Sequence, residues 1–247
     1  MAGVKIRAGM TFQRHEKKYL VPPNRLSSLL DALDAYMRPD EYGLHTISSL
    51  YYDTADFTLI RKSLDKPAFK QKLRLRSYGV PGETDTVYLE LKKKLSGVTY
   101  KRRMAMPLWR ARDYMDHAAI PPESRANRQT FGEIDWFVKR EPLAPKTLLS
   151  YDRIALYGKN DRDFRMTLDA NIRWRDHNLD LGMGDYGRSL CGPGMRLLEI
   201  KTMGALPLWL CDILSELELY PQSFSKYGTV YTEHLMNMSK EVATIAG

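Results

Sequence analysis

Cysteine is scarce in this sequence of 247 residues, which contains only Cys191 and Cys211. Neither residue stands in the CxxC or Cys/His spacing that a structural zinc site requires. Both are most simply interpreted as free thiols in a reducing compartment, although the sequence leaves a single disulfide between them open.

Long apolar runs and targeting signals are also missing. The most apolar stretch, residues 206–214, is interrupted by Pro207 and Asp212 and is far too short to span a bilayer. Residues 1–10 contain two cations but no following apolar segment, unlike a secretory signal. We therefore expect a cytoplasmic protein without a transmembrane segment, which a partner could still bring to a membrane.

Acidic residues are outnumbered, with 30 Asp and Glu against 38 Lys and Arg, a formal net charge of +8. This excess points to a polyanionic partner such as nucleic acid, a phosphate chain or anionic lipid, but charge alone does not choose among them. A soluble basic protein without such a partner fits the composition equally well. The chain is long enough for one large domain, and 43% hydrophobic residues are ample for its core.

The most informative pattern is a ladder of charges at every second residue. A β-strand places such residues on one face. Three neighbouring segments, separated by turn residues at Pro81-Gly82 and Ser96-Gly97, share the alternation and contribute Lys70, Lys72, Arg74, Arg76, Glu90, Lys92, Lys94, Lys101 and Arg103. Because like charges on neighbouring strands repel, we expect an anion to bind between them.

Periodicity and turn residues predict the remaining elements. Antiparallel strands are predicted at residues 12–21, 46–53, 69–78, 84–93, 98–106, 147–157, 164–169 and 195–202. Helices are predicted at residues 24–37, 54–62, 108–119, 128–139 and 206–217, and from Ser225 onward. A long loop is predicted at 173–194, with continuation of a strand into its early part as the alternative. These elements predict an α+β fold in one domain, residues 10–238. An eight-stranded antiparallel β-barrel with charges inside and flanking α-helices outside is expected, and an open sheet is the alternative.

Carboxylates accompany the cations on the inward faces. A site for phosphate alone could be purely basic. Glu16, Glu90 and Glu199 instead suit a divalent cation that bridges phosphate oxygens.

Seven short motifs in order strengthen this interpretation. They are Arg14-x-Glu16-x-Lys18, Ser49-Leu-Tyr-Tyr-Asp53-Thr54, Lys72-x-Arg74-x-Arg76, Leu89-Glu90-x-Lys92-Lys93, Tyr151-x-Arg153, Leu198-Glu199-x-Lys201 and Ser223-Phe-Ser-Lys226-Tyr227. Together, over residues 11–228, they resemble the VTC domain. This is the catalytic domain of the eukaryotic vacuolar transporter chaperone complex, has bacterial relatives and belongs to the triphosphate tunnel metalloenzyme superfamily.

The resemblance implies a tunnel-shaped barrel and a metal-dependent inorganic polyphosphate polymerase, which moves the terminal phosphoryl group of ATP onto a growing polyphosphate chain. ATP or another nucleoside triphosphate and inorganic polyphosphate are then the partners, and nucleic acid is not expected because the cations face inward. The implied catalytic contacts are Arg74, Arg76, Lys92, Arg153 and Lys226. The implied phosphate-binding residues are Lys18, Lys72, Lys101, Tyr151, Lys201 and Ser225. The implied ligands of Mn²⁺ or Mg²⁺ are Glu199, Glu16 and Glu90.

Two departures from the family pattern qualify the expected activity. Arg14 replaces the first Glu of the superfamily's Glu-x-Glu-x-Lys signature, which removes a potential metal ligand and favours the polymerase branch over simple triphosphatases. Ser223 stands where a phosphate-binding Lys is expected. A triphosphatase or polyphosphatase, and a non-catalytic polyphosphate or nucleotide sensor, remain alternatives.

Two local orientations also stay open. A one-residue register shift would turn Lys101 outward and bring Arg102 in. Of Tyr51 and Tyr52, one should face inward and the other the core.

Overall fold

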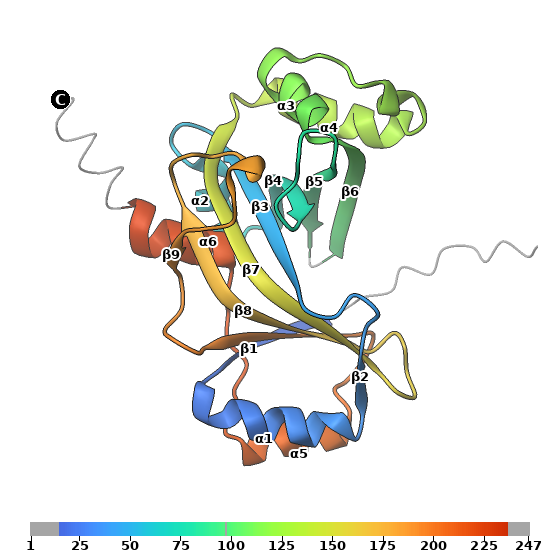
Figure 1. Ribbon diagram of the computed structural model, residues 1–247, viewed down its shortest axis with the longest axis vertical. Coiled ribbons are helices and arrows are strands. Elements are labelled where there is room, and N and C mark those ends of the chain that lie inside the picture. The colour runs from blue at the N-terminus through green and yellow to red at the C-terminus, as the bar shows by residue number, and fades with distance from the viewer. Residues whose placement is uncertain (1–14, 97, 237–247) are drawn as a thin grey trace, which may run out of the picture.

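The structure is a computed structural model that describes residues 15–96 and 98–236. Its strands form one antiparallel sheet, in which the described path runs β1-β10-β8-β7-β3-β4-β5-β6, with β2 paired to β7 and β9 to β8 (Figure 1). The strands are β1 (His15–Val21), β2 (Met37–Pro39), β3 (His45–Asp53), β4 (Phe69–Tyr78), β5 (Thr86–Leu95), β6 (Val98–Pro107), β7 (Ala144–Gly158), β8 (Arg165–Arg175), β9 (Arg188–Ser189) and β10 (Arg196–Thr202).

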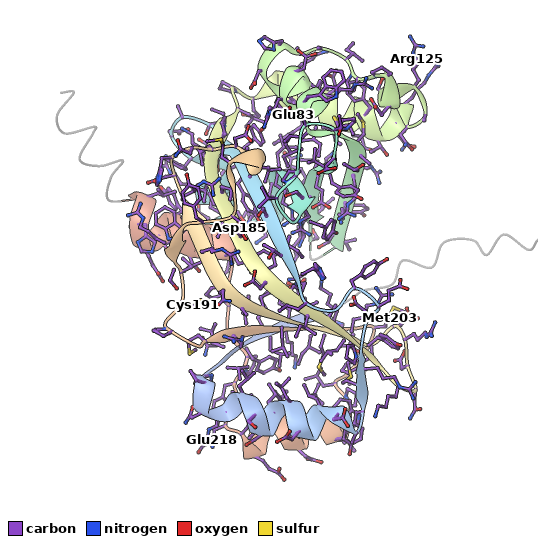
Figure 2. The ribbon with its side chains drawn as sticks, in the orientation of Figure 1. Glu83, Arg125, Asp185, Cys191, Met203 and Glu218 are labelled. Carbon is purple, nitrogen blue, oxygen red and sulfur yellow. The ribbon has the colours of Figure 1, made fainter. Side chains whose placement is uncertain are left out.

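Helices cover the sheet in separate groups. They are α1 (Pro23–Asp34), α2 (Thr58–Leu64), α3 (Leu108–His117), α4 (Arg128–Arg140), α5 (Leu208–Glu216) and α6 (Lys226–Val230), with short turns η1 (Pro122–Arg125), η2 (Leu181–Met183) and η3 (Tyr231–Leu235). Figure 1 shows α3 and α4 together at one end of the molecule and α1 and α5 together at the other. In Figure 2 the labelled Arg125 and Glu218 mark these two ends, and side chains fill the space between the sheet and the helices.

The alternation seen in the sequence sends apolar residues to the outer face of the sheet. Leu73 and Leu75 of β4 and Leu89 and Leu91 of β5 are fully buried in a cluster with residues of α3 and α4. A second cluster joins β1, β10 and β8 to α1 and α5. Burial of one such leucine stabilises the fold by about 2 kcal/mol. A one-residue slip would move the intervening cations into these cores, so the apolar faces fix the register.

The α+β class and the antiparallel sheet are as predicted, but the structure does not close the sheet into a barrel. Among the described residues, β1 and β6 end the path and do not pair with each other. Both carry charges in succession, Glu16-Lys17-Lys18 on β1 and Lys101-Arg102-Arg103 on β6. Charges of this kind on edge strands discourage further pairing.

The sheet is nevertheless strongly bent, so that its inner face is concave. Burial opposes ionisation of Glu16 on β1, whereas Lys18 and also Lys92 on β5 lower its pKa. Lys92 exerts this influence although β10, β8, β7, β3 and β4 lie between the two strands along the path. The inner side chains of both ends of the sheet therefore share one electrostatic environment.

Some predicted boundaries differ from the observed ones. The predicted helix 24–37 ends at Asp34, because Met37 begins β2 and pairs with Gly158. The predicted loop 173–194 begins with the end of β8, the alternative that the sequence left open, and also contains η2 and β9. The predicted strand at 12–21 is observed from His15, and residues 12–14, with Arg14, lie outside the described residues. Both Cys191, labelled in Figure 2, and Cys211 are free thiols.

Candidate phosphate-binding site

The register of four neighbouring strands assembles a row of polar side chains on the concave face. Tyr51 of β3 pairs with Arg74 of β4, Arg74 pairs with Glu90 of β5, and Glu90 pairs with Arg103 of β6. Directly opposed residues of antiparallel strands have Cβ atoms about 5 Å apart. The row therefore aligns four residues from four strands across the concave face, each in contact with the next.

Glu90 is the centre of a cluster of four cations, which we call the Glu90 cluster: Arg74, Arg76, Lys101, Arg103 and Glu90 itself. Its Oε2 atom lies 2.7 Å from Arg74 Nη2 and 3.9 Å from Arg76 Nε. Its Oε1 atom lies 2.8 Å from Lys101 Nζ and 2.6 Å from Arg103 Nη2. The Glu90 side chain is only 1% exposed. One carboxylate thus holds four cations together and leaves a large excess of positive charge.

The pKa of Glu90 reflects these neighbours. Burial alone would raise it, but Arg74, Arg76 and Lys101 hold it far below its ordinary value. Glu90 therefore remains a carboxylate at any physiological pH.

Three tyrosines of the concave face orient the guanidinium groups. Tyr51 Oη accepts a hydrogen bond from Arg74 Nη1 at 3.2 Å, and Tyr151 Oη accepts one from Arg76 Nη2 at 3.2 Å. At the rim, Tyr78 Oη accepts from Arg103 Nη2 at 3.3 Å. Each arginine is thereby held by a carboxylate on one side and a tyrosine on the other, which limits its rotamers before any ligand binds.

A second cluster is formed by residues of β1, β10, β8, β7 and α6, and contains as many carboxylates as cations. We call it the Glu199 cluster, and its members are Lys18, Arg153, Lys226, Glu16, Asp169 and Glu199. Arg153 Nε and Lys226 Nζ each lie 2.5 Å from the fully buried carboxylate of Asp169. Three cations approach Glu199, at 3.3 Å, 3.5 Å and 3.6 Å for Lys226, Lys18 and Arg153.

The charges of this cluster stabilise one another. Burial opposes ionisation of Glu199, but Lys226, Lys18 and Arg153 hold its pKa far below the ordinary range. Burial also disfavours the charged form of Lys226, but Asp169 and Glu199 raise its pKa above the ordinary value. Both groups are consequently charged at neutral pH.

Residues 224–227 connect the walls of the concave face. The Phe224 carbonyl oxygen accepts a hydrogen bond from Lys18 Nζ at 2.9 Å, and Ser225 Oγ accepts one from Lys72 Nζ at 3.1 Å. Ser225 Oγ also accepts from the Gly228 amide and so caps α6. The Tyr227 hydroxyl donates to Asp53 Oδ2 at 3.0 Å. The conformation of this segment is thus tied to β1, β3, β4 and, through Lys226, to β8 and β10.

Lys72, Lys92 and Lys201 differ from the other inner cations. Across the described parts of the chain, no carboxylate oxygen lies within the 4.0 Å of an ion pair from any of their Nζ atoms. Burial lowers the pKa of Lys72 to about 8, and although Tyr51 favours its charged form, the cations Lys92 and Lys18 disfavour it. These three lysines are positioned to receive negative charge from a ligand.

Comparison with known proteins agrees with the sequence motifs. The family model of the VTC domain matches residues 13–233, most of the chain. The chain belongs to the VTC domain family. No curated protein matches it.

A solved structure supports the fold of this VTC domain. The crystal structure of a putative adenylate cyclase from Bacillus halodurans superposes with a TM-score of 0.53, covering 86% of this chain and 95% of the other. The two sequences are 15% identical, so this likeness concerns the fold alone. In the described part of the VTC domain, no helix is long and apolar enough to cross a membrane. Family and fold together support a polyphosphate-related enzyme of the phosphotransferase type.

The structure brings the residues predicted from the sequence to the same concave face. Lys101 lies against Glu90, whereas Arg102 Nε lies 2.8 Å from Glu133 of α4 on the outer face. Tyr51 faces inward, and Tyr52 packs in the outer core with α3 and α4.

One member of the clusters was missed by reasoning from the sequence. Arg103 was part of the predicted charge ladder, although it was not among the implied site residues. Asp169 gave no such signal, because its pairing opposite Arg153 depends on the register of the β7–β8 hairpin.

The carboxylates of the Glu199 cluster fit a divalent cation. The charge of Glu199 opposes ionisation of Glu16, so the two carboxylates lie within electrostatic reach. Thr167 of β8 pairs with Glu199 of β10. Its buried Oγ1 atom has no hydrogen-bond partner in the described structure. Mg²⁺ is often held by one or two carboxylates together with substrate phosphates. Within residues 15–96 and 98–236, no group of three or more His, Cys, Asp or Glu side chains offers a complete site by itself.

Proposed function

We propose that this VTC domain is an inorganic polyphosphate polymerase that transfers the terminal phosphoryl group of ATP to a growing polyphosphate chain. The observation that carries the proposal is the Glu90 cluster, where four cations surround one buried carboxylate beside lysines without counter-ions. At reduced dielectric such an excess of positive charge is unfavourable until a multivalent anion binds. A triphosphate supplies several negative charges in one ligand.

In this proposal Arg74, Arg76 and Lys101 bind the triphosphate of ATP. Guanidinium groups hold phosphate oxygens in bidentate geometry, which fixes the direction of the phosphoryl group. Glu90 is proposed as the carboxylate that positions these cations and not as a metal ligand, because cations hold its oxygens at 2.6, 2.7 and 2.8 Å. The cations around Glu199 lie farther away, at 3.3, 3.5 and 3.6 Å.

The lysines that form no close ion pair in the described structure, Lys72, Lys92 and Lys201, are proposed to hold the acceptor chain. The terminal oxygen of that chain forms a bond to the γ-phosphorus, the bond from this phosphorus to the bridging oxygen breaks, and ADP leaves. Such a reaction requires positioning and charge neutralisation and no protein nucleophile. Arg153 and Lys226, both 2.5 Å from Asp169, are proposed to stabilise the charge that develops on the transferred group.

Glu199 and Glu16 are proposed to hold Mn²⁺ or Mg²⁺ together with phosphate oxygens. When bound, the ion neutralises phosphate charge and aligns the reacting oxygens. Lys18 contacts both carboxylates, at 3.5 Å and 3.2 Å, and keeps them on the same side of the site.

The test is incubation of the purified protein with ATP and Mn²⁺, following long-chain polyphosphate on gels and free phosphate in solution. Wild type should produce polyphosphate, and Arg74→Ala and Glu199→Gln should not. Arg102→Ala is the matched control, because it removes an arginine from the outer face of the same sheet. Free phosphate without polyphosphate would instead establish a triphosphatase, and nucleotide binding without either product would establish a sensor.

A further inference from the structure

Tyr51 occupies a position on the concave face for which the proposed roles above do not account. Its ring stacks on Tyr227, with centroids 4.7 Å apart and planes inclined by 20°. Its hydroxyl reaches the cations and accepts a hydrogen bond from Arg74 Nη1. The residue thus has an apolar anchor at one end and a cationic environment at the other.

The hydrogen of the Tyr51 hydroxyl has no acceptor among the described residues, since the one partner of this oxygen is the guanidinium of Arg74. Two other buried tyrosines do have an acceptor for the hydroxyl hydrogen. The Tyr227 hydroxyl donates to Asp53, and the Tyr114 hydroxyl donates to Asp135 at 3.1 Å. A donor without an acceptor beside several cations is suited to an anionic oxygen.

The groups that face Tyr51 make this position complementary to a polyanion. Arg74, Arg76 and Lys72 of β4 surround the hydroxyl, with Tyr227 of α6 beneath the ring. Lys72 itself faces Lys92 of β5, Lys18 of β1 and Lys70 of β4, and its hydrogen-bond acceptor is the neutral Ser225. The charged neighbours of both groups are therefore cations.

We propose that the Tyr51 hydroxyl donates a hydrogen bond to a phosphate oxygen of the bound polyphosphate or triphosphate, beside the ammonium group of Lys72. Tyr51 and Tyr151 then act as a pair, each orienting one arginine and each offering one proton to the ligand. This contact deepens the proposed function and rests on it.

The ionisation of both groups gives the contact a pH dependence. Burial opposes ionisation of Tyr51, but Arg74, Arg76 and Lys72 lower its pKa to about 8. The pKa of Lys72 is also about 8. As the pH rises above this value, Tyr51 loses the donated proton and Lys72 loses its charge, so both changes weaken binding of an anion. Bound phosphate favours the protonated forms, and binding should therefore take up protons near pH 8.

The experiment measures binding of tripolyphosphate to wild type and Tyr51→Phe by calorimetry, without metal, across this pH range. A hydrogen bond to a charged group predicts about 10-fold weaker binding by Tyr51→Phe near pH 7. The difference should vanish near about pH 9 and reverse above it, because the tyrosinate of wild type repels the anion. Tyr52→Phe is the matched control, because the adjacent ring lies in the outer core. Equal affinity of Tyr51→Phe and wild type near pH 7, or weaker binding by Tyr51→Phe that persists at high pH, would overturn the contact.

A second measurement does not depend on that variant. In wild type held near pH 8.5, added tripolyphosphate should lower the tyrosinate absorbance, because the ligand returns the proton to Tyr51. Unchanged absorbance under saturating ligand would overturn the proposal. Failure of wild type to bind tripolyphosphate at all would overturn the proposed function as well, whereas the preceding outcomes affect Tyr51 alone.

Discussion

The two charged clusters of the concave face are built from the same residue types in different proportions. In the Glu90 cluster four cations share one carboxylate, whereas in the Glu199 cluster three cations meet three carboxylates. The first is unbalanced and is completed by an anion. The second is balanced and is stable without one. The proposed function accordingly places the triphosphate of ATP at the first cluster and the divalent cation at the second.

The largest expected effect comes from removing the single counter-charge of the Glu90 cluster. Glu90→Gln should lower the free energy of unfolding by about 3 kcal/mol, because it leaves four cations without a carboxylate. Denaturant titration measures the loss, and tripolyphosphate should restore part of it. Glu133→Gln is the control, since Glu133 bridges Lys93 and Arg102 on the outer face and is 29% exposed. Similar losses of unfolding free energy in both variants would show that stability depends on Glu90 no more than on Glu133.

Removing a cation should affect the two clusters in opposite ways. Arg74→Ala should weaken tripolyphosphate binding about 100-fold with little loss of stability, because it relieves repulsion among cations. Lys226→Ala should destabilise the protein, because it leaves the buried Asp169 carboxylate with Arg153 as its one remaining charge partner. Calorimetry and denaturant titration on both variants provide the test. A stability loss in Arg74→Ala as large as that in Lys226→Ala would contradict the distinction.

The balanced cluster should determine metal affinity. Glu199→Gln should weaken Mn²⁺ binding to the protein–tripolyphosphate complex about 10-fold, while leaving metal-free tripolyphosphate binding close to that of wild type. Electron paramagnetic resonance of free Mn²⁺ measures this directly. If Glu199→Gln retains Mn²⁺ affinity, the ion binds elsewhere.

The smallest effect concerns Lys72, which belongs to neither cluster. Its folded-state pKa of about 8 lies below the ordinary value of 10.5, so between these values the unfolded chain binds more protons. The stability of the ligand-free protein should therefore rise with pH across this window, and Tyr51 contributes with the same sign. Lys72→Met should raise stability near pH 7 by about 1 kcal/mol and flatten the profile, while weakening tripolyphosphate binding. Thermal unfolding at several pH values checks the gain in stability and the flattened pH profile.

The sequence predicted the Glu90 cluster better than the Glu199 cluster. Short turns join β4, β5 and β6, so alternation within each strand fixes which residues meet, and Lys101 and Arg103 fall on the face of Glu90. In the Glu199 cluster, Lys18 pairs with Glu199, which lies far along the chain. No local pattern specifies such a pairing. The buried Asp169 was missed for the same reason.

Closure of the sheet was the main structural feature that the sequence did not determine. Alternation fixes which face of each strand is polar, and both a closed barrel and a bent open sheet satisfy it. The outcome depends on the total twist and on how the two end strands meet. In the described structure, the charges of β1 and β6 leave these edges unpaired.

Residues 224–227 contact parts of the chain that are synthesised much earlier, and this affects the order in which the two clusters assemble. Lys18 and the Phe224 carbonyl, which it contacts, are separated by 206 positions. During synthesis, β4, β5 and β6 emerge from the ribosome before Arg153, Asp169, Glu199 and Lys226, so the Glu90 cluster can assemble while four members of the Glu199 cluster are still missing. The nascent protein thus acquires the Glu90 cluster first. We expect phosphate chains present during synthesis to act as a folding ligand for the Glu90 cluster before the Glu199 cluster is complete.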